Sequence, residues 1–261
     1  MLSKNKIKFI NSLKKKKNRI NKGFFIAEGE KIISELISDS TYKITELFAT
    51  DSFLSKLSNQ QKSTIDELHT ITEEELKKIS DLKKPNKTIA VVKIPKHTIE
   101  PEEIKKSLCL VLDNINDPGN LGTIIRTADW FGINHIFCSE GSVDLYNPKV
   151  IQSTMGSFMR IKLLYKNLET FLPKFTDVKG FQIYGCFLEG ENIYSAPLQD
   201  KGFIVMGSES HGISDKLEKH IHQKLYIPRF ITNNNQRPAE SLNISVATGI
   251  VCSEFRRELI K

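Results

Sequence analysis

The sequence of 261 residues contains little cysteine and lacks a long hydrophobic run. Its cysteines form no Cys-x-x-Cys pair and no cluster with histidine, since they stand far apart at Cys109, Cys138, Cys186 and Cys252. This spacing argues against a zinc centre or a disulfide framework and favours buried thiols in a reducing compartment. No apolar segment approaches the roughly 18 residues that span a bilayer, and the N-terminus lacks the apolar core of a secretory signal. We therefore expect a cytoplasmic protein with neither a membrane partner nor a metal.

Acidic residues are absent before Glu28, although lysine is abundant there. The basic residues of this segment are Lys4, Lys6, Lys8, the run Lys14 to Lys17, Arg19 and Lys22. Such a block is typical of an RNA-contacting arm and equally of a solvated chain terminus. Mitochondrial transit peptides favour arginine, whereas this segment uses lysine. The net charge of +7 agrees with a polyanionic partner without establishing one.

The pattern of apolar residues divides the chain into three parts. Residues 1–95 mix helical and strand patterns, and residues 96–106 are charged and lack periodicity, which indicates a linker. In residues 107–261 short apolar runs alternate with helical stretches, which predicts a mostly parallel α/β sheet. The predicted strands of this last part are Leu108–Leu112, Ile133–Cys138, Phe181–Phe187, Phe203–Met206 and Lys224–Ile227.

The first part begins with a predicted amphipathic helix whose apolar stripe consists of Ile7, Ile10, Leu13 and Ile20. Thr72 and Glu75 have the spacing of a capping box and predict the start of another helix. Other helices are predicted from about Glu28 to Ser38 and from Ser52 to Leu57. The predicted strands are Phe24–Ala27, Ile44–Thr50 and Ile89–Val92.

A first motif, from Leu112 to Gly132, joins a strand to a helix. The strand ends at Asp113, an Asp-Pro-Gly turn follows, and the helix is expected to start near Asn120, six residues before Arg126. Backbone N–H groups at such a helix start lack partners and attract anions. Taken alone, the motif is equally an ordinary turn with a surface arginine.

A second motif runs from Phe203 to Ser214, where an apolar strand meets Gly207 and a second glycine precedes a helix. A glycine at the end of a strand lets a ligand approach the backbone, and open α/β sheets bind ligands outside the carboxyl ends of their strands. Glu209 offers a hydrogen-bond acceptor there. An ordinary strand–turn–helix explains the same pattern.

A third motif runs from Leu225 to Glu258. A strand ends at Ile227, Ser241 is placed to cap a long helix, and Asn243 offers a donor and an acceptor in its first turn. Helical spacing predicts core positions at Leu242, Val246, Ile250 and Ile260.

The order of the three motifs resembles that of a known family. Asn-x-Gly-x-x-x-Arg, then Gly-Ser-Glu-x-x-Gly, then Ile-Pro with a downstream Ser-Leu-Asn-x-Ser is similar to the SpoU (TrmH-like) branch of the SPOUT methyltransferases, from about Leu108 to Lys261. In the first part, Phe-x-x-Glu-Gly-x-Lys from Phe25 to Lys31 is similar to the RNA substrate-binding domain that precedes many members.

This resemblance implies an α/β protein in which a C-terminal trefoil-knotted methyltransferase domain follows a smaller N-terminal α/β substrate-binding domain. It also implies S-adenosylmethionine as cofactor, a homodimer, and methylation of a ribose 2′-hydroxyl of structured RNA, with ribosomal RNA favoured slightly over transfer RNA. The residues that match the family's catalytic positions are Arg126, Asn120, Glu209, Ser241 and Asn243. Those that match its cofactor contacts are Gly207, Ile227 and Leu242.

The role of Arg126 stays open between two versions. Methyl transfer needs the 2′-hydroxyl to lose its proton, and a guanidinium with a pKa above about 12 is a poor base. Either Arg126 is deprotonated with help from an RNA phosphate, or it clamps phosphate and ribose while another group takes the proton. Its charge and bidentate geometry favour the clamp.

The chain departs from the family pattern at residues 229–240, where a longer loop without glycine carries Arg229 and Arg237. This loop either reaches RNA or is a plain exposed loop. The alternative to an enzyme is a non-catalytic RNA-binding protein on the same scaffold, which would be expected to have lost motif residues. The Ser-Leu-Asn segment argues against a base-modifying relative, and the lack of Gly-x-Gly-x-x-Gly after a strand argues against a dehydrogenase.

Overall fold

The computed structural model describes residues 2–82, 86–230 and 239–257, and the chain forms two compact units. Unit 1 comprises Met1–Lys96 together with Asp144–Met159, and unit 2 comprises His97–Val143 together with Arg160–Lys261. The sequence predicts a single second domain over residues 107–261, so the grouping of Asp144–Met159 with the first unit differs from that expectation. The expected linker, residues 96–106, contains the short helix α7 (Pro101–Lys105).

Unit 1 is built on a four-stranded sheet in the order β1-β4-β2-β3. The strands are β1 (Phe24–Glu28), β2 (Ile44–Ala49), β3 (Glu67–Thr70) and β4 (Thr88–Lys93). β4 runs antiparallel to both of its neighbours, and β2 runs parallel to β3. The helical segments of this unit are α1 (Lys4–Ser12), α2 (Lys16–Lys22), α3 (Glu30–Ser38), α4 (Asp51–Leu54), α5 (Asn59–Ser63), α6 (Glu73–Lys77), α9 (Pro148–Thr154) and the 3₁₀ turn η1 (Ser157–Met159).

The basic N-terminal segment folds as two helices that belong to the unit 1 core. Ile10 and Leu13 are fully buried in one hydrophobic cluster with residues of β1, β2 and β4. The chain turns between α1 and α2, so Ile20 does not continue the stripe and is 64% exposed. The prediction that Ile20 belongs to one continuous apolar stripe is therefore wrong, because a break in the helix shifts the phase of its faces.

The segment Asp144–Met159 packs into unit 1 through aromatic contacts and one buried ion pair. The ring centroid of Phe25 lies 4.7 Å from that of Tyr146 and 6.0 Å from that of Phe158. Arg19, only 2% exposed, pairs with Asp144 at 2.6 Å. The Arg19 guanidinium also donates hydrogen bonds to two backbone carbonyls at the end of α1, so its hydrogen-bonding groups stabilise the fold of unit 1.

Unit 2 is built on a six-stranded sheet in the order β10-β8-β9-β5-β6-β7, in which every neighbouring pair is parallel. The strands are β5 (Leu108–Leu112), β6 (His135–Ser139), β7 (Lys162–Lys166), β8 (Gln182–Asn192), β9 (Gly202–Met206) and β10 (Gln223–Tyr226). The other helices of this unit are α8 (Pro118–Trp130), α10 (Leu168–Phe171), α11 (Pro173–Thr176), α12 (Asp215–Glu218) and α13 (Ile244–Arg257). The predicted parallel α/β sheet is thus confirmed.

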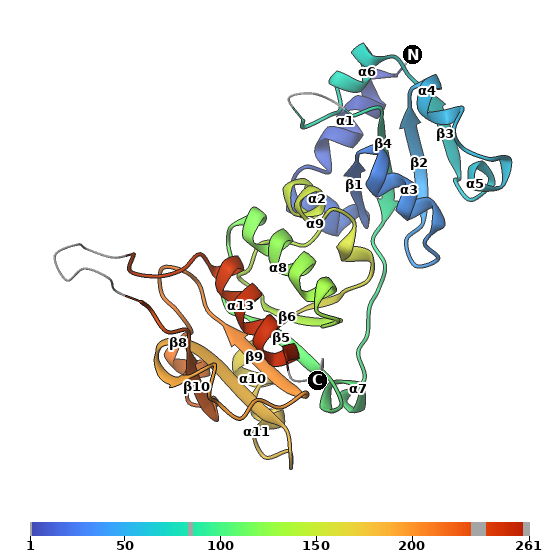
Figure 1. Cartoon of the computed structure of the whole chain (residues 1–261). Coiled ribbons are helices and arrows are strands. Elements are labelled where there is room, and N and C mark those ends of the chain that lie inside the picture. The colour runs from blue at the N-terminus through green and yellow to red at the C-terminus, as the bar shows by residue number, and fades with distance from the viewer. Residues whose placement is uncertain (1, 83–85, 231–238, 258–261) are drawn as a thin grey trace. The chain divides into compact units, whose positions relative to one another are not determined.

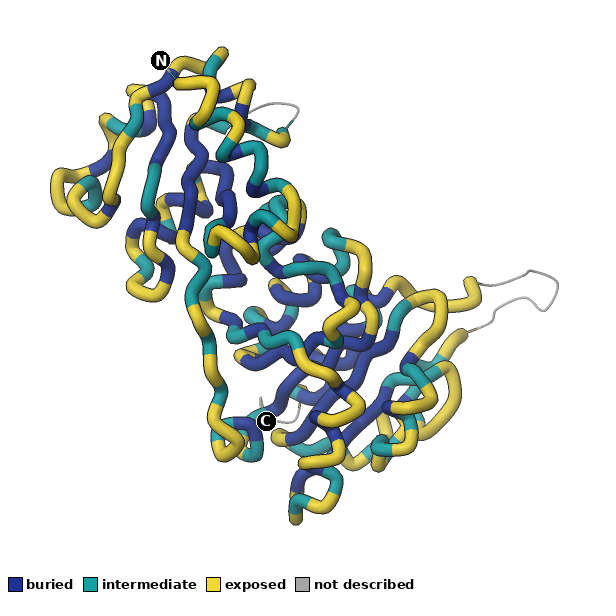
Figure 2. The backbone as a smooth tube through the Cα atoms, turned by 180° about the vertical axis from the view of Figure 1, so that it is seen from behind, coloured by how far each residue is buried: buried dark blue, intermediate teal, exposed yellow. Residues whose placement is uncertain are grey.

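Helices cover both faces of this sheet, as expected for buried parallel strands. One face packs against α10 and α11 through a cluster that contains Phe171, Phe175 and Phe203. The other face meets α13, where the rings of Tyr184 and Phe255 lie 4.9 Å apart, and α8 packs against α13 (Figure 1). The tube view shows that the buried residues run along the strands of each sheet (Figure 2).

Local signals in the sequence identified most elements but missed the short ones. The capping box of Thr72 and Glu75 is confirmed, with reciprocal hydrogen bonds of 3.2 and 3.1 Å. The segments that the sequence did not predict include β3, β7, α5 and α7. Within the described parts of the chain, no helix has the length and apolar character needed to cross a membrane.

Candidate functional site

The candidate site lies in unit 2, at the edge of the sheet where β5, β9 and β10 end. Because these strands are parallel, the segments that follow them emerge at the same edge. After β5 the chain enters α8, after β9 it forms the loop that contains Gly207 and Glu209, and after β10 it leads toward α13. All three sequence motifs therefore contribute to one edge.

Three polar side chains from the three motifs meet around one carboxylate oxygen. Glu209 Oε1 accepts hydrogen bonds from Asn120 Nδ2 at 3.1 Å and from Asn243 Nδ2 at 2.8 Å. It also accepts from the backbone N–H of Ile244 at 3.1 Å, and Asn243 Nδ2 lies 3.0 Å from Asn120 Oδ1. We call Asn120, Glu209 and Asn243 the polar triad. It ties together segments that are 89 and 34 residues apart in the chain.

The start of α13 shows why Asn243 holds its position. Its Oδ1 accepts from the N–H of Ser245 at 3.0 Å, and its backbone carbonyl accepts from Ala247, so Asn243 caps the helix. The prediction that Ser241 caps the helix and that Asn243 lies inside its first turn is therefore wrong. Ser241 is exposed two residues earlier, and its hydroxyl has no hydrogen-bond partner among the described residues.

Arg126 lies apart from the polar triad. α8 begins at Pro118, capped by Asp117, whose Oδ1 accepts from the N–H of Asn120 at 2.8 Å. Arg126 follows Asn120 by six residues, which at 1.5 Å per residue places it about 9 Å further along the helix axis. Its side chain is exposed, and no carboxylate in the described part of the chain pairs with it. The structure thus presents a free guanidinium on the helix whose first turn carries Asn120.

Gly207 is required by the packing of its own loop. A Cβ at this position would lie 2.0 Å from the backbone carbon of Gly212 and 2.2 Å from the N of Ile213. Ser208 and Gly212 exchange two backbone hydrogen bonds, of 3.0 and 2.8 Å, which close the turn. The sequence suggested that Gly207 makes room for a ligand, but its first constraint is the close approach of Gly212.

A buried carboxylate that the sequence motifs did not single out holds the far end of the same loop. Asp113, 3% exposed, accepts from the N–H of Ser214 through Oδ2 at 3.0 Å and from the side chain of Asn114 through Oδ1 at 2.9 Å. An aspartate directly after a fully buried strand is the signal that could have identified it. Asp113 therefore couples the end of β5 to the end of the Gly207 loop.

The expected cofactor contacts lie in the segments that follow β9 and β10. Gly207 and Ile227 each follow the last residue of a parallel strand, β9 and β10. Leu242 directly precedes Asn243 and is 46% exposed. Open backbone groups at strand ends together with an exposed leucine suit a ligand that combines a flat apolar group with polar edges.

The helical spacing in the third motif predicts core positions that the structure does not bury. Leu242 is 46% and Val246 is 51% exposed, and Ile250 is half-buried. The buried residues of α13 are instead Ile244, Thr248, Val251, Cys252, Glu254 and Phe255. Two faces of α13 carry apolar residues, and the sequence identified the wrong one. Ile260 lies outside the described residues.

The loop at residues 229–240 is described only at its two ends. Arg229 Nη1 donates to the carbonyl of Ala239 at 3.3 Å, which brings these ends together. Phe230 is 86% exposed. Arg237, named above as a residue that could reach RNA, lies outside the described residues.

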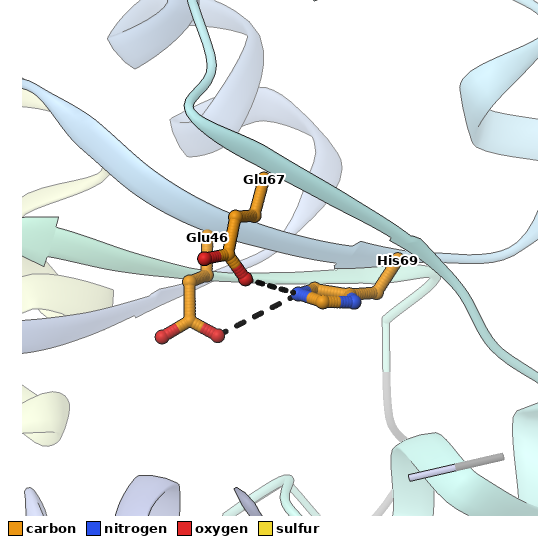
Figure 3. A group of neighbouring side chains, drawn as sticks. All are labelled: Glu46, Glu67 and His69. Carbon is orange, nitrogen blue, oxygen red and sulfur yellow. Dashed lines mark ion pairs between the residues drawn. The ribbon is translucent and has the colours of Figure 1, made fainter.

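A second group of titratable side chains lies in unit 1, on β2 and β3 (Figure 3). His69 Nε2 is 3.3 Å from Glu67 Oε2 and 3.6 Å from Glu46 Oε2, and their ligand atoms all lie within 4.8 Å of one another. The ammonium of Lys6 contacts the same Glu46 oxygen, and the imidazole stacks on Phe48. Lys6 therefore joins α1 to the sheet through Glu46.

Two family models match successive parts of the chain. Residues 107–253 match the model of the SpoU rRNA Methylase family, and residues 4–90 match that of the MRM3-like substrate binding domain. The 23S rRNA (guanosine(2553)-2′-O)-methyltransferase RlmP of Bacillus subtilis is 27% identical over 96% of both chains.

Solved structures show the same similarity over the whole chain. A putative RNA methyltransferase of the TrmH family from Porphyromonas gingivalis has 37% identity, covers 99% of both chains and gives a TM-score of 0.87. The AdoMet-bound rRNA methyltransferase from Sinorhizobium meliloti has 26% identity, covers 100% of this chain and 97% of its own, and gives a TM-score of 0.86. With the three motifs joined at one sheet edge, the chain belongs to the SpoU rRNA methylase family of RNA methyltransferases.

Proposed function

We propose that this protein transfers the methyl group of S-adenosylmethionine to a ribose 2′-hydroxyl of ribosomal RNA. The observation that carries the proposal is the polar triad, which joins the three motifs at one edge of the sheet, with the exposed Arg126 further along α8. The Bacillus subtilis relative is named as a 2′-O-methyltransferase of 23S rRNA, and it matches nearly the whole chain, including the N-terminal unit. The choice of ribosomal over transfer RNA rests on that full-length match.

The residues at the sheet edge suit the cofactor by their chemistry. The Gly207 loop, Ile227 and Leu242 offer backbone groups and an exposed apolar side chain, and the Sinorhizobium meliloti relative contains AdoMet. When bound, S-adenosylmethionine supplies a methyl group on a positively charged sulfur, which departs as a neutral thioether. The protein's contribution is to hold the loops so that the 2′-oxygen and the methyl group are aligned, and well-aligned reactants gain roughly 7–11 kcal/mol.

The polar triad serves this alignment by holding the loops together. Glu209 restrains the loop after β9 against the starts of α8 and α13, through Asn120 and Asn243. Ser241, exposed just before Asn243, is available to contact the substrate. We assign these four residues to the catalytic site on this basis.

Arg126 acts in this proposal as a clamp on the RNA phosphate and ribose. A guanidinium stays protonated at neutral pH and donates two parallel hydrogen bonds to a phosphate. Arg126 is exposed and has no competing carboxylate among the described residues. A phosphate held there fixes the neighbouring 2′-hydroxyl, whose proton passes to another acceptor as the new C–O bond forms.

The test is a comparison of Arg126→Ala and Arg126→Lys with the unchanged protein and with Lys174→Ala, an exposed cation on α11. Titration calorimetry measures binding of S-adenosylmethionine, and tritium transfer to unmodified ribosomal RNA measures activity. Both Arg126 variants are expected to bind the cofactor normally and to lose most of the transfer, because lysine cannot reproduce the bidentate fork. Normal transfer by Arg126→Ala would exclude the assigned role.

Two further features belong to the proposal. The trefoil knot of the family is expected in unit 2, and the parallel strand order is compatible with it. A homodimer is supported by apolar side chains on the packed helices α8 and α13, because Trp130 is 85% and Val246 51% exposed. Sedimentation equilibrium of Trp130→Glu tests the dimer: a shift to monomer is expected, and an unchanged mass contradicts this surface.

A further inference from the structure

We propose that a lysine-lined hollow at one end of the unit 1 sheet binds a backbone phosphate of the RNA substrate; the identity of this anion rests on the proposed function. The hollow has a volume of about 270 Å³. Its lining residues are Thr41, Lys43, Lys93, Ile94, Pro95 and Lys96. They come from the turn before β2 and from the end of β4, two segments that the sheet brings together.

Strand pairing places two of these lysines, Lys43 and Lys93, opposite each other. Ile44 pairs with Val92 in the antiparallel β2–β4 ladder, and one residue further out the N–H of Lys93 donates to the carbonyl of Lys43 at 2.9 Å. Lys43 and Lys93 are therefore cross-strand neighbours on the same face of the sheet. Like charges in this arrangement repel and destabilise the pairing. An anion between the two ammonium groups would relieve the repulsion.

The acidic residues nearby leave the hollow positively charged. Lys43 pairs with Asp66 at 3.0 Å, but both side chains are about half exposed, so the pair is weak and exchangeable. The Asp39 carboxylate is engaged by the backbone N–H groups of Thr41 and Tyr42, at 2.7 and 2.9 Å. In the described part of the chain, no carboxylate pairs with the other two lysines of the hollow.

The positive surface continues toward α2. Phe24 is the other cross-strand neighbour of Lys93, and its ring packs edge-on against Phe9 with 6.4 Å between centroids. The ammonium of Lys22 lies 4.8 Å from the centroid of Phe9. Lys22 therefore lies on the face of the sheet that carries Lys93, with Phe9 and Phe24 between the two lysines.

The chemistry of the hollow fits a phosphate group and not a base. No aromatic ring lines it, so it lacks the stacking platform that holds single-stranded bases. Lysine binds phosphate as a point charge and carries no sequence information. The hollow therefore positions the RNA on unit 1 and leaves nucleotide choice to other contacts.

The test uses the full-length double variant Lys93→Gln/Lys96→Gln and an unmodified transcript of large-subunit ribosomal RNA. Its Kd is measured by filter binding across a series of salt concentrations. Loss of one phosphate contact raises Kd about eightfold at about 0.1 M salt, and lowers the slope of log K against log salt by about 1. In methyl transfer the RNA KM is expected to rise while kcat at saturating RNA is unchanged.

The matched control is Lys77→Gln/Lys78→Gln, which removes the same charge from exposed lysines at the end of α6 and should leave the salt slope unchanged. If Lys93→Gln/Lys96→Gln binds the RNA with the same Kd and the same salt slope as the unchanged protein, the proposal is overturned. It is also overturned if only Lys4→Gln/Lys8→Gln lowers the slope, since the RNA would then follow α1. If Lys93→Gln/Lys96→Gln lowers the slope but the unchanged protein transfers no methyl group, the phosphate site in the hollow is supported and the proposed function is refuted.

Discussion

Replacement of Glu209 by alanine tests the polar triad most directly. One oxygen of this carboxylate accepts three hydrogen bonds, from Asn120, Asn243 and the N–H of Ile244. Alanine removes all of them and leaves a first-turn amide of α13 without its acceptor. The loop that follows β9 then loses its tie to both helices.

The burial of each hydrogen bond sets the loss of unfolding free energy in Glu209→Ala. Both asparagine hydrogen bonds to Glu209 are exposed to solvent, so water replaces the lost acceptor and each bond contributes about 0.5 kcal/mol. The helix-terminal N–H is partly buried and resembles a capping bond of about 1 kcal/mol. Together these give a destabilisation of about 2 kcal/mol, which lowers Tm by about 4–8 °C in a chain of this size. The rate falls further, because a misplacement of about 1 Å costs about 100-fold.

Differential scanning calorimetry and single-turnover methyl transfer measure the two effects in Glu209→Ala and Glu209→Gln. The glutamine side chain keeps the shape and one carbonyl oxygen, so its Tm is expected to stay close to that of the unchanged protein. A Glu209→Ala protein with an unchanged Tm and a rate within a few-fold of normal would refute the reasoning.

Three further changes have expected outcomes. Gly207→Ala places a Cβ 2.0 Å from the backbone of Gly212, which costs about 1–3 kcal/mol and weakens binding of S-adenosylmethionine measured by calorimetry. Arg19→Met leaves Asp144 without its buried partner, and urea unfolding is expected to show a loss of about 3–5 kcal/mol. Burial raises the pKa of Cys252 to about 12, so at about pH 8 only about one thiol in ten thousand is the reactive thiolate. Mass spectrometry should find Cys252 unalkylated by iodoacetamide in the native protein and alkylated in urea.

Matched variants separate these effects from general damage. Gly249→Ala adds a methyl group inside α13 where nothing lies within 4 Å, so it should be neutral or stabilising. Lys17→Met removes an exposed charge from the helix that carries Arg19 and should change little. Normal binding of S-adenosylmethionine by Gly207→Ala would contradict the first prediction. Equal losses of unfolding free energy in Arg19→Met and Lys17→Met would contradict the second. Rapid alkylation of Cys252 in the native protein would contradict the third.

Much of the fold was predictable because its signals are local. The strand at Leu108–Leu112 matches the structure residue for residue, since five consecutive apolar residues predict a buried strand. The capping box of Thr72 depends on spacing alone. By contrast, Ile20 and Val246 fit helical spacing and are exposed. Periodicity shows that a helix has an apolar face, but the neighbouring elements decide which face is buried.

The residues of the candidate site could be predicted from the sequence, but their arrangement in space could not. Family motifs identified Asn120, Glu209 and Asn243, although no local pattern places them within hydrogen-bonding distance of one another. The cap at the start of α13 belongs to Asn243, two residues after Ser241, because helix ends depend on which backbone groups find partners. The arginine of the first motif, Arg126, stands apart from the three because the helix axis carries it away.

By itself, the sequence determined the α/β character of the second unit, the order of its three motifs and the polar residues that each of them carries. Only the tertiary structure decided that Glu209 is the acceptor that joins those motifs, since the segments are brought together by parallel strands that end at one edge. It also decided that Asp144–Met159 folds with the first unit, through Arg19 and Phe25. These contacts link residues far apart in the chain, and no spacing along the sequence encodes them.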